Sequence, residues 1–183
     1  TIERAIRFLL NDQQQDGHFT SRDGNDYAHP IASYALSEAF ALTSVPMVKE
    51  AAEKATMRIV EGQHDSGGWN YKLNSAINAA TGKARDDTSY MAWCAQALKA
   101  ARMANLNVPG LDRAMKRAIL GFKQQAAPSG GFGYDQPGNT GLTGAGVLCL
   151  QLLGAAKDPD TKKGLRILES RTCKWDDSSG QRP

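Results

Sequence analysis

The sequence predicts an all-α fold built of repeated helix pairs, and two observations carry this prediction. A short pattern of glutamine, glycine and an aromatic residue occurs three times along the 183 residues. Around each copy, apolar side chains recur at the i, i+3, i+4 spacing of a helix. Strand patterns are weak, because the segment 130–134 has too many glycines for a strand interior. We therefore expect little or no sheet.

The repeat is defined by three stretches, each of which starts at an alanine that follows a basic residue. In every copy the glycine follows that alanine by about 12 residues and the aromatic residue by about 14. A degenerate fourth copy starts at Lys163-Gly164, where Trp175 comes earlier than the spacing requires. The aligned residues are Ala5, Gln13, Gly17 and Phe19; Ala55, Gln63, Gly67 and Trp69; and Ala118, Gln125, Gly130 and Phe132.

The first helix of each unit is predicted to be amphipathic. Residues 2–14, 48–59 and 111–122 each place their apolar side chains on one face, and Pro109-Gly110 provides a start signal for the third. A helix with one apolar face covers the outside of a core. These three helices are therefore expected to form an outer layer.

The second helix of each unit is predicted to be buried on most sides. The runs 31–43, 88–104 and 142–155 are apolar around most of their circumference. Alternation of the two helix types predicts two concentric layers, with the buried helices inside. Corresponding positions in the three runs are Tyr34, Trp93 and Leu148; Ala35, Cys94 and Cys149; and His29, Thr88 and Thr143.

Composition excludes several classes of protein. With 41% apolar residues the chain can bury a core, so disorder is not expected. No apolar run reaches the length that spans a bilayer, and the net charge of +3 is dispersed, so we expect neither a membrane span nor nucleic-acid binding. The chain begins with Thr1, and we interpret residues 1–183 as a single repeat domain cut from a longer protein. Its compartment is not predicted.

The repeated Gln-x-x-x-Gly-x-aromatic segment resembles the motif of the squalene cyclase and protein prenyltransferase superfamily. Residues 13–19 and 63–69 match it at full spacing, and 125–132 match with one extra residue. The chain is most similar to uncharacterised bacterial proteins with prenyltransferase and squalene oxidase repeats, a group of which the run 87–109 is typical. The resemblance implies a terpenoid cyclase-like α/α toroid, here a partial ring of about three and a half repeats. In such folds the motif is structural, and its glutamine caps helix ends.

Asp86-Asp87-Thr88 opens the second buried helix. Terpene cyclases of the alkene-protonating class carry an acidic motif at a comparable place, so the resemblance implies Asp86 as proton donor and Asp87 as its neighbour. This sequence departs from the motif, since its first acidic position is Ala84, and Arg85 would favour the ionised form of Asp86. The alternative is structural: Asp87 is the N-cap of the helix.

The resemblance to prenyltransferases raises the question of zinc. In those proteins Asp, Cys and His hold the metal, but the third copy lacks an Asp-x-Cys element and the histidines lack ligand spacing. We predict no metal and no cofactor. His29 precedes Pro30 and is expected as an N-cap or loop residue, which would lie at the rim of a ligand pocket if the ring centre holds one.

Tyr34, Tyr90 and Trp93 lie on the predicted inner helices. Two interpretations are open: these side chains line an aromatic cavity suited to an isoprenoid, or they pack in the core. Cys94 and Cys149 are expected to be small buried hydrophobes.

Three functional hypotheses follow. The first is a module that binds an apolar small molecule or a protein partner, or that self-associates through its open inner face. The second is an isoprenoid-processing enzyme that uses Asp86 as general acid. The third is a glycan-active toroid, which requires two facing carboxylates from the set Asp26, Asp86, Asp87 and Asp135.

Overall fold

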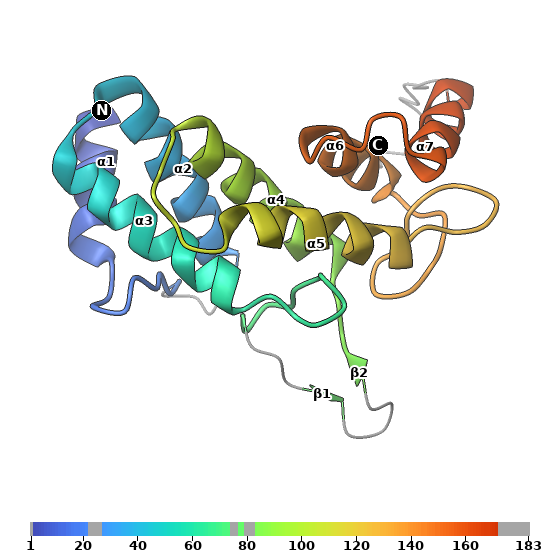
Figure 1. The fold of residues 1–183 in the computed structure, drawn as a ribbon, viewed down its shortest axis with the longest axis horizontal. Coiled ribbons are helices and arrows are strands. Elements are labelled where there is room, and N and C mark those ends of the chain that lie inside the picture. Colours follow the sequence, from blue (N-terminus) through green and yellow to red (C-terminus); the bar gives the residue numbers. More distant parts are fainter. Residues whose placement is uncertain (1, 22–26, 74–76, 79–82, 172–183) are drawn as a thin grey trace, which may run out of the picture.

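The computed structural model describes residues 2–21, 27–73, 77–78 and 83–171. Within these ranges the chain forms helices and one small hairpin (Figure 1). Strands β1 (Ile77–Asn78) and β2 (Lys83–Ala84) pair antiparallel, in agreement with the expectation of little sheet. The helices are α1 (Ile2–Asp12), α2 (Ala28–Thr43), α3 (Pro46–Glu61), α4 (Thr88–Met103), α5 (Leu111–Gln124), α6 (Thr143–Leu152) and α7 (Pro159–Ser170).

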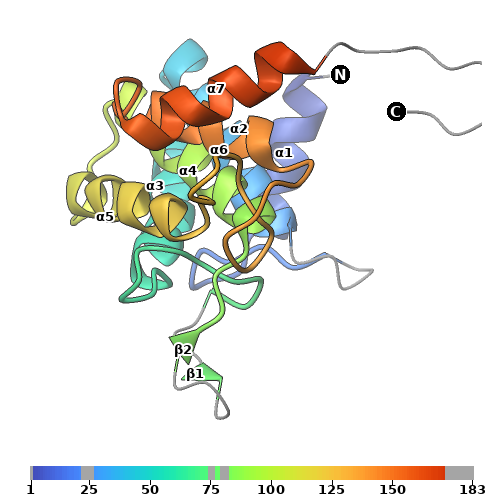
Figure 2. The ribbon, with the colours of Figure 1, turned by 90° about the vertical axis from the view of Figure 1, so that its right-hand side faces the viewer.

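The helices form the two predicted layers. Helices α2, α4 and α6 contact one another in chain order, and α3, α5 and α7 pack against them (Figures 1 and 2). Helix α4 is the most deeply buried, because α2, α3, α5 and α6 all contact it. The prediction of an all-α fold of helix pairs is therefore confirmed.

Helix α2 begins earlier than the sequence predicts, at Ala28 instead of residue 31. Pro30 is its third residue, and the backbone N–H that proline lacks would have no partner in the first helical turn. His29 is thus inside the helix and is not its N-cap, a position that Tyr27 occupies.

The first two motif glutamines, Gln13 and Gln63, each join their unit to the next. Gln63 Nε2 donates to the carbonyl of Gly67 in its own loop, at 2.9 Å, and to the carbonyl of Ala114 in the following outer helix, also at 2.9 Å. Gln13 makes the same pair of bonds, at 3.1 Å to Gly17 and 2.9 Å to Ala51. One side chain therefore holds the loop closed and fixes it to its neighbour.

The motif glycines lie directly on the next outer helix. A Cβ at Gly17 would be 2.8 Å from the carbonyl carbon of Lys54, and a Cβ at Gly67 would clash with the carbonyl of Arg117. Gly130 also lies on α7, where a Cβ would be 2.8 Å from the side chain of Ile167 and 3.2 Å from Cβ of Lys163. Each receiving residue is the basic residue that opens the next copy of the repeat, so α7 takes the place of the first helix of a fourth unit.

We predict that Gly67→Ala destabilises the protein by about 2–4 kcal/mol, because the new methyl group meets backbone and the residue has φ +92°. Urea unfolding followed by circular dichroism measures this loss. Gly144→Ala is the matched control, since nothing lies within 4 Å of a Cβ there and the position is helical. It should change the free energy of unfolding by about 1 kcal/mol or less, towards greater stability. Equal changes in the free energy of unfolding of the two variants would contradict the packing of the Gly67 loop on α5.

Candidate functional site

The candidate site lies where the motif loop of the second unit meets the N-terminus of α4. Asp87 is the N-cap of this helix, and its Oδ1 accepts hydrogen bonds from the backbone N–H groups of Ser89, at 3.0 Å, and Tyr90, at 3.1 Å. The Ser89 hydroxyl donates to the same oxygen at 2.5 Å. This is the structural alternative predicted from the sequence, and it commits one carboxylate oxygen of Asp87 to the helix.

Asp86 is buried and paired with a histidine. Its Oδ1 lies 2.7 Å from Nδ1 of His64, and the two side chains are 4% and 0% exposed. The carboxylate lies against the backbone of Gly68, where any Cβ would clash with it. The absence of a side chain at Gly68 is therefore what admits Asp86 to this position.

Arg85 does not act on Asp86 as its place in the sequence suggested. Its Nε donates to Asp135 at 2.8 Å, and its guanidinium lies 5.7 Å from the ring centre of Tyr134. The hydrogen bond to Asp135 raises the pKa of Arg85. The expectation that Arg85 stabilises ionised Asp86 is thus replaced by an ion pair with the third unit.

Four hydroxyl groups from three units gather beside Asp87. The Tyr27 hydroxyl lies 2.6 Å from Ser89 Oγ and 3.1 Å from the hydroxyl of Tyr71, which in turn bonds to that of Tyr134. Burial raises the pKa of Tyr27 to about 12. The sequence interpretation missed this cluster. The sequence contains one signal for the cluster: Tyr71 and Tyr134 each follow a motif aromatic residue by two positions.

The three aromatic residues proposed for a cavity separate into two groups. Tyr90 is fully buried, with its ring centre 5.8 Å from that of Tyr27 and 5.3 Å from that of Tyr71, so it belongs to the core. Tyr34 and Trp93 are half-buried at equivalent positions of α2 and α4. Only these two keep a surface that a ligand could contact.

Comparison with known proteins agrees with this architecture. Residues 1–148 match the squalene-hopene cyclase C-terminal domain. The chain belongs to this family. Enfumafungin synthase of Hormonema carpetanum is 26% identical over 117 residues, which are 63% of this chain and 8% of that protein. The chain thus spans a small part of the length of this relative. No solved structure matches the chain at a significant level.

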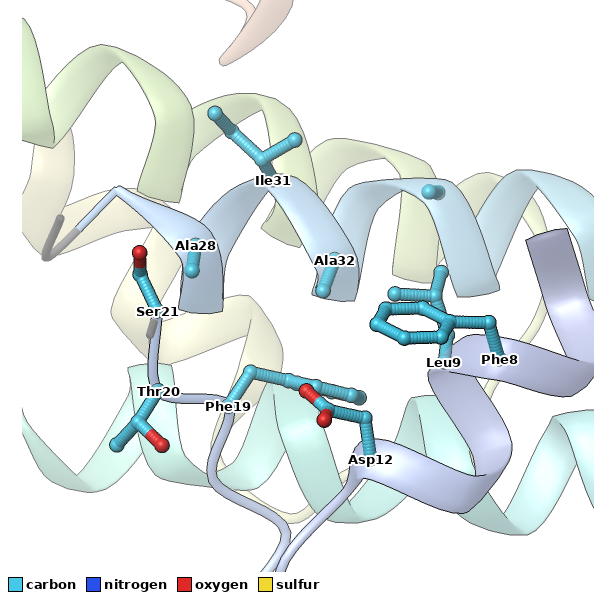
Figure 3. Close-up of a pocket in the computed structure, with 10 residues that line it drawn as sticks. Phe8, Leu9, Asp12, Phe19, Thr20, Ser21, Ala28, Ile31 and Ala32 are labelled. Atoms are coloured by element: carbon cyan, nitrogen blue, oxygen red, sulfur yellow. The ribbon is translucent and has the colours of Figure 1, made fainter. Parts of the chain in front are cut away.

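An apolar pocket of about 410 Å³ lies between α1 and α2 of this cyclase-family domain (Figure 3). Asp12, Thr20 and Ser21 bring the polar groups of its lining. The other lining residues are Phe8, Leu9, Phe19, Ala28, Ile31, Ala32 and Ala35.

The other candidates for chemistry are engaged elsewhere or inert. Burial raises the pKa of Cys94 and brings that of Cys149 to about 12, so neither thiol is activated. Within the described ranges no three His, Cys, Asp or Glu side chains could hold a metal together, and no helix is long and apolar enough to cross a membrane. Asp135 pairs with Arg85, and Asp26, like Trp175, lies outside the described residues.

His29 has a structural role and is not a rim residue. Only 1% of it is exposed; the backbone N–H of Phe19 donates to Nδ1 at 3.2 Å, and Nε2 donates to the carbonyl of Ala55 at 3.1 Å. In the third unit Thr143 does the first of these tasks, accepting from the N–H of Phe132. Burial of the ring lowers the pKa of His29 to about 3. The neutral imidazole is therefore part of the fold.

We predict that the cyclase-family domain loses stability as the pH falls through 6.5 towards 3. The unfolded chain binds a proton at His29 near its ordinary pKa of 6.5, whereas the folded chain does not until about pH 3. The expected loss is about 1.4 kcal/mol per pH unit in this window. The hydrogen bond from the backbone N–H of His18 lowers the pKa of the neighbouring Asp16, so this carboxyl titrates at the acid end of the window or below it.

Urea unfolding at about pH 7.5 and about pH 5 measures this loss. His29→Thr is the matched variant, because threonine serves at the equivalent position of the third unit. It should be less stable at neutral pH and should lose less stability on acidification than the natural chain. An unchanged pH dependence would contradict the assignment to His29.

Proposed function

We propose that this domain is a binding module of the cyclase family, which holds an apolar ligand such as an isoprenoid without protonating it. The burial and pairing of Asp86 carry the proposal. Alkene protonation needs a carboxylic acid that faces a dry cavity. Asp86 is 4% exposed and bound to His64, Asp87 caps a helix, and neither lines the apolar pocket between α1 and α2.

The proposed ligand surface is the face of the inner helices that carries the equivalent residues Tyr34, Trp93 and Leu148. Tyr34 and Trp93 are half-buried, and Leu148 is 46% exposed. Because these residues occupy the same repeat position on successive helices, we expect them to form an apolar stripe across the inner layer. Aromatic and aliphatic side chains in such a stripe suit an extended hydrocarbon.

We predict that the purified protein, incubated with a panel of linear isoprenoids that includes squalene, retains one of them unchanged. Mass spectrometry of organic extracts identifies what is retained. Trp93→Ala should lower the retained amount severalfold, because the largest side chain of the stripe is lost. Leu120→Ala, at a position 58% exposed on the outer helix α5, is the control and should have no effect. A cyclised product in the extract would contradict a purely binding role.

A second candidate function is an isoprenoid-processing enzyme that uses Asp86 as general acid. One observation favours it: the guanidinium of Arg85 is paired with Asp135 and not with Asp86. The name of the relative from Hormonema carpetanum, a synthase, describes that protein as an enzyme.

Asp86→Asn distinguishes the two candidates. Under the binding proposal we predict a loss of about 1–3 kcal/mol in stability, because a buried hydrogen bond to His64 is weakened. Isoprenoid retention should stay within error of the natural protein. Thermal unfolding and the extraction assay measure the two quantities. A gain in stability together with the loss of a product made by the natural protein would instead establish Asp86 as the acid.

A further inference from the structure

Helix α4 keeps one face open although it lies in the middle of the array. The inner helices before and after it, α2 and α6, both contact α4, yet Ser89, Trp93 and Gln96 are only half-buried. These three residues follow one another at the i, i+4, i+7 spacing of a single helix face. The open face is therefore a feature of the middle of the array and not of its ends.

Hydroxyl groups gather at the N-terminal end of this face. Ser89 precedes Trp93 by one helical turn. Tyr27, which has helical backbone angles, precedes Tyr34 by two turns. The surface of the proposed ligand, which carries Tyr34 and Trp93, thus has a polar end. We call the four residues whose hydroxyl groups form that end the hydroxyl cluster: Tyr27, Tyr71, Ser89 and Tyr134.

The Asp87 carboxylate fixes the direction of the hydrogen bonds in the hydroxyl cluster. Each hydroxyl group has one proton, and Ser89 donates its proton to Asp87. The Ser89 oxygen therefore accepts the proton of Tyr27, at 2.6 Å. By the same reasoning Tyr71 donates to Tyr27 at 3.1 Å, and Tyr134 donates to Tyr71. All four protons are used along one chain of hydrogen bonds that ends at Asp87.

Tyr134 is the most exposed member of the hydroxyl cluster, at 38%, and its proton is also held inside. A hydrogen bond towards the Asp87 carboxylate raises the pKa of Tyr134, so the phenol stays protonated at neutral pH. Arg85 lies over the ring of Tyr134, where Asp135 compensates its charge. Towards a ligand the hydroxyl cluster therefore offers oxygen lone pairs and no hydroxyl proton.

We propose that the ligand of this domain is a linear isoprenoid alcohol, whose hydroxyl group donates to the hydroxyl cluster while its chain lies along Tyr34 and Trp93. This inference rests on the binding function proposed above and names the chemical class of the ligand. An isoprenoid ether or ester has only acceptors at its end, and these would face other acceptors. A hydrocarbon would leave the lone pairs of the hydroxyl cluster without a partner.

Three ligands with the same farnesyl chain test the proposal: farnesol, farnesyl methyl ether and the hydrocarbon farnesene. Equilibrium dialysis against the 183-residue chain, with each ligand quantified by mass spectrometry, gives the three dissociation constants. Farnesol should bind about tenfold more tightly than the methyl ether, which corresponds to about one net hydrogen bond. Farnesene should bind no more tightly than the ether.

Tyr134→Phe should reduce the preference for farnesol over the ether severalfold, because it removes the most exposed acceptor of the hydroxyl cluster. It should leave the binding of farnesene unchanged. Thr43→Val is the matched control, since it removes an exposed hydroxyl group at the opposite end of α2 and should keep the full preference. Circular dichroism checks that both variants are folded.

The outcomes separate this inference from the binding function on which it rests. Equal binding of the three ligands, or a preference for farnesol that survives Tyr134→Phe, would overturn the assignment of an alcohol and leave the binding function intact. Binding of none of the three would refute the binding function and the inference with it. Trp93→Ala should weaken all three ligands by the same factor, because it removes a contact to the chain and not to the hydroxyl end.

Discussion

The seat of each motif loop on the next outer helix is the contact on which the rest of the molecule depends. In the first two units a glycine with positive φ lies on the backbone of the residue that opens the following unit, and a glutamine amide bonds both across its own loop and to that helix. Because the contact joins only neighbours, the array grows by repetition. The buried helices α2, α4 and α6 are then brought side by side, and their N-terminal ends meet the loops.

Where the motif loops meet the N-termini of the inner helices, most polar side chains make hydrogen bonds that stabilise the fold. The N-terminus of a buried helix has backbone N–H groups without partners, and Asp87, His29 and Thr143 each satisfy backbone groups in their own unit. Arg85 and Asp135 tie the second unit to the third. At the N-terminus of a buried helix, capping is a sufficient explanation for a carboxylate, and catalysis need not be invoked. Asp86 is the exception, because its partner is a side chain and not the backbone.

Local patterns predicted the helices and the cap, whereas contacts across the repeat could not be predicted. Helical periodicity and the order Asp-Thr-Ser are properties of neighbouring residues, so Asp87 could be assigned from the sequence. The pairing of Asp86 with His64 depends on how a loop folds over Gly68, and the partner of Arg85 lies 50 residues away in sequence. The expectation for Arg85 was wrong for this reason: a long side chain can pair with a carboxylate other than the one next to it in sequence. Tyr90 was ambiguous because an aromatic residue on an inner helix fits a cavity or a core equally well.

The same repeat position can be core or surface, and which of these it is depends on whether a neighbouring unit covers it. Tyr90 and Ile31 occupy equivalent positions, yet the first is fully buried and the second is 39% exposed. Burial in an array is thus a property of the pair of units and not of the residue. Position 38 agrees with this view, since Glu38 is exposed on α2 whereas the equivalent Ala97 of α4 is fully buried. A carboxylate is stable at an exposed position, whereas at the buried position of Ala97 it would need a cation beside it.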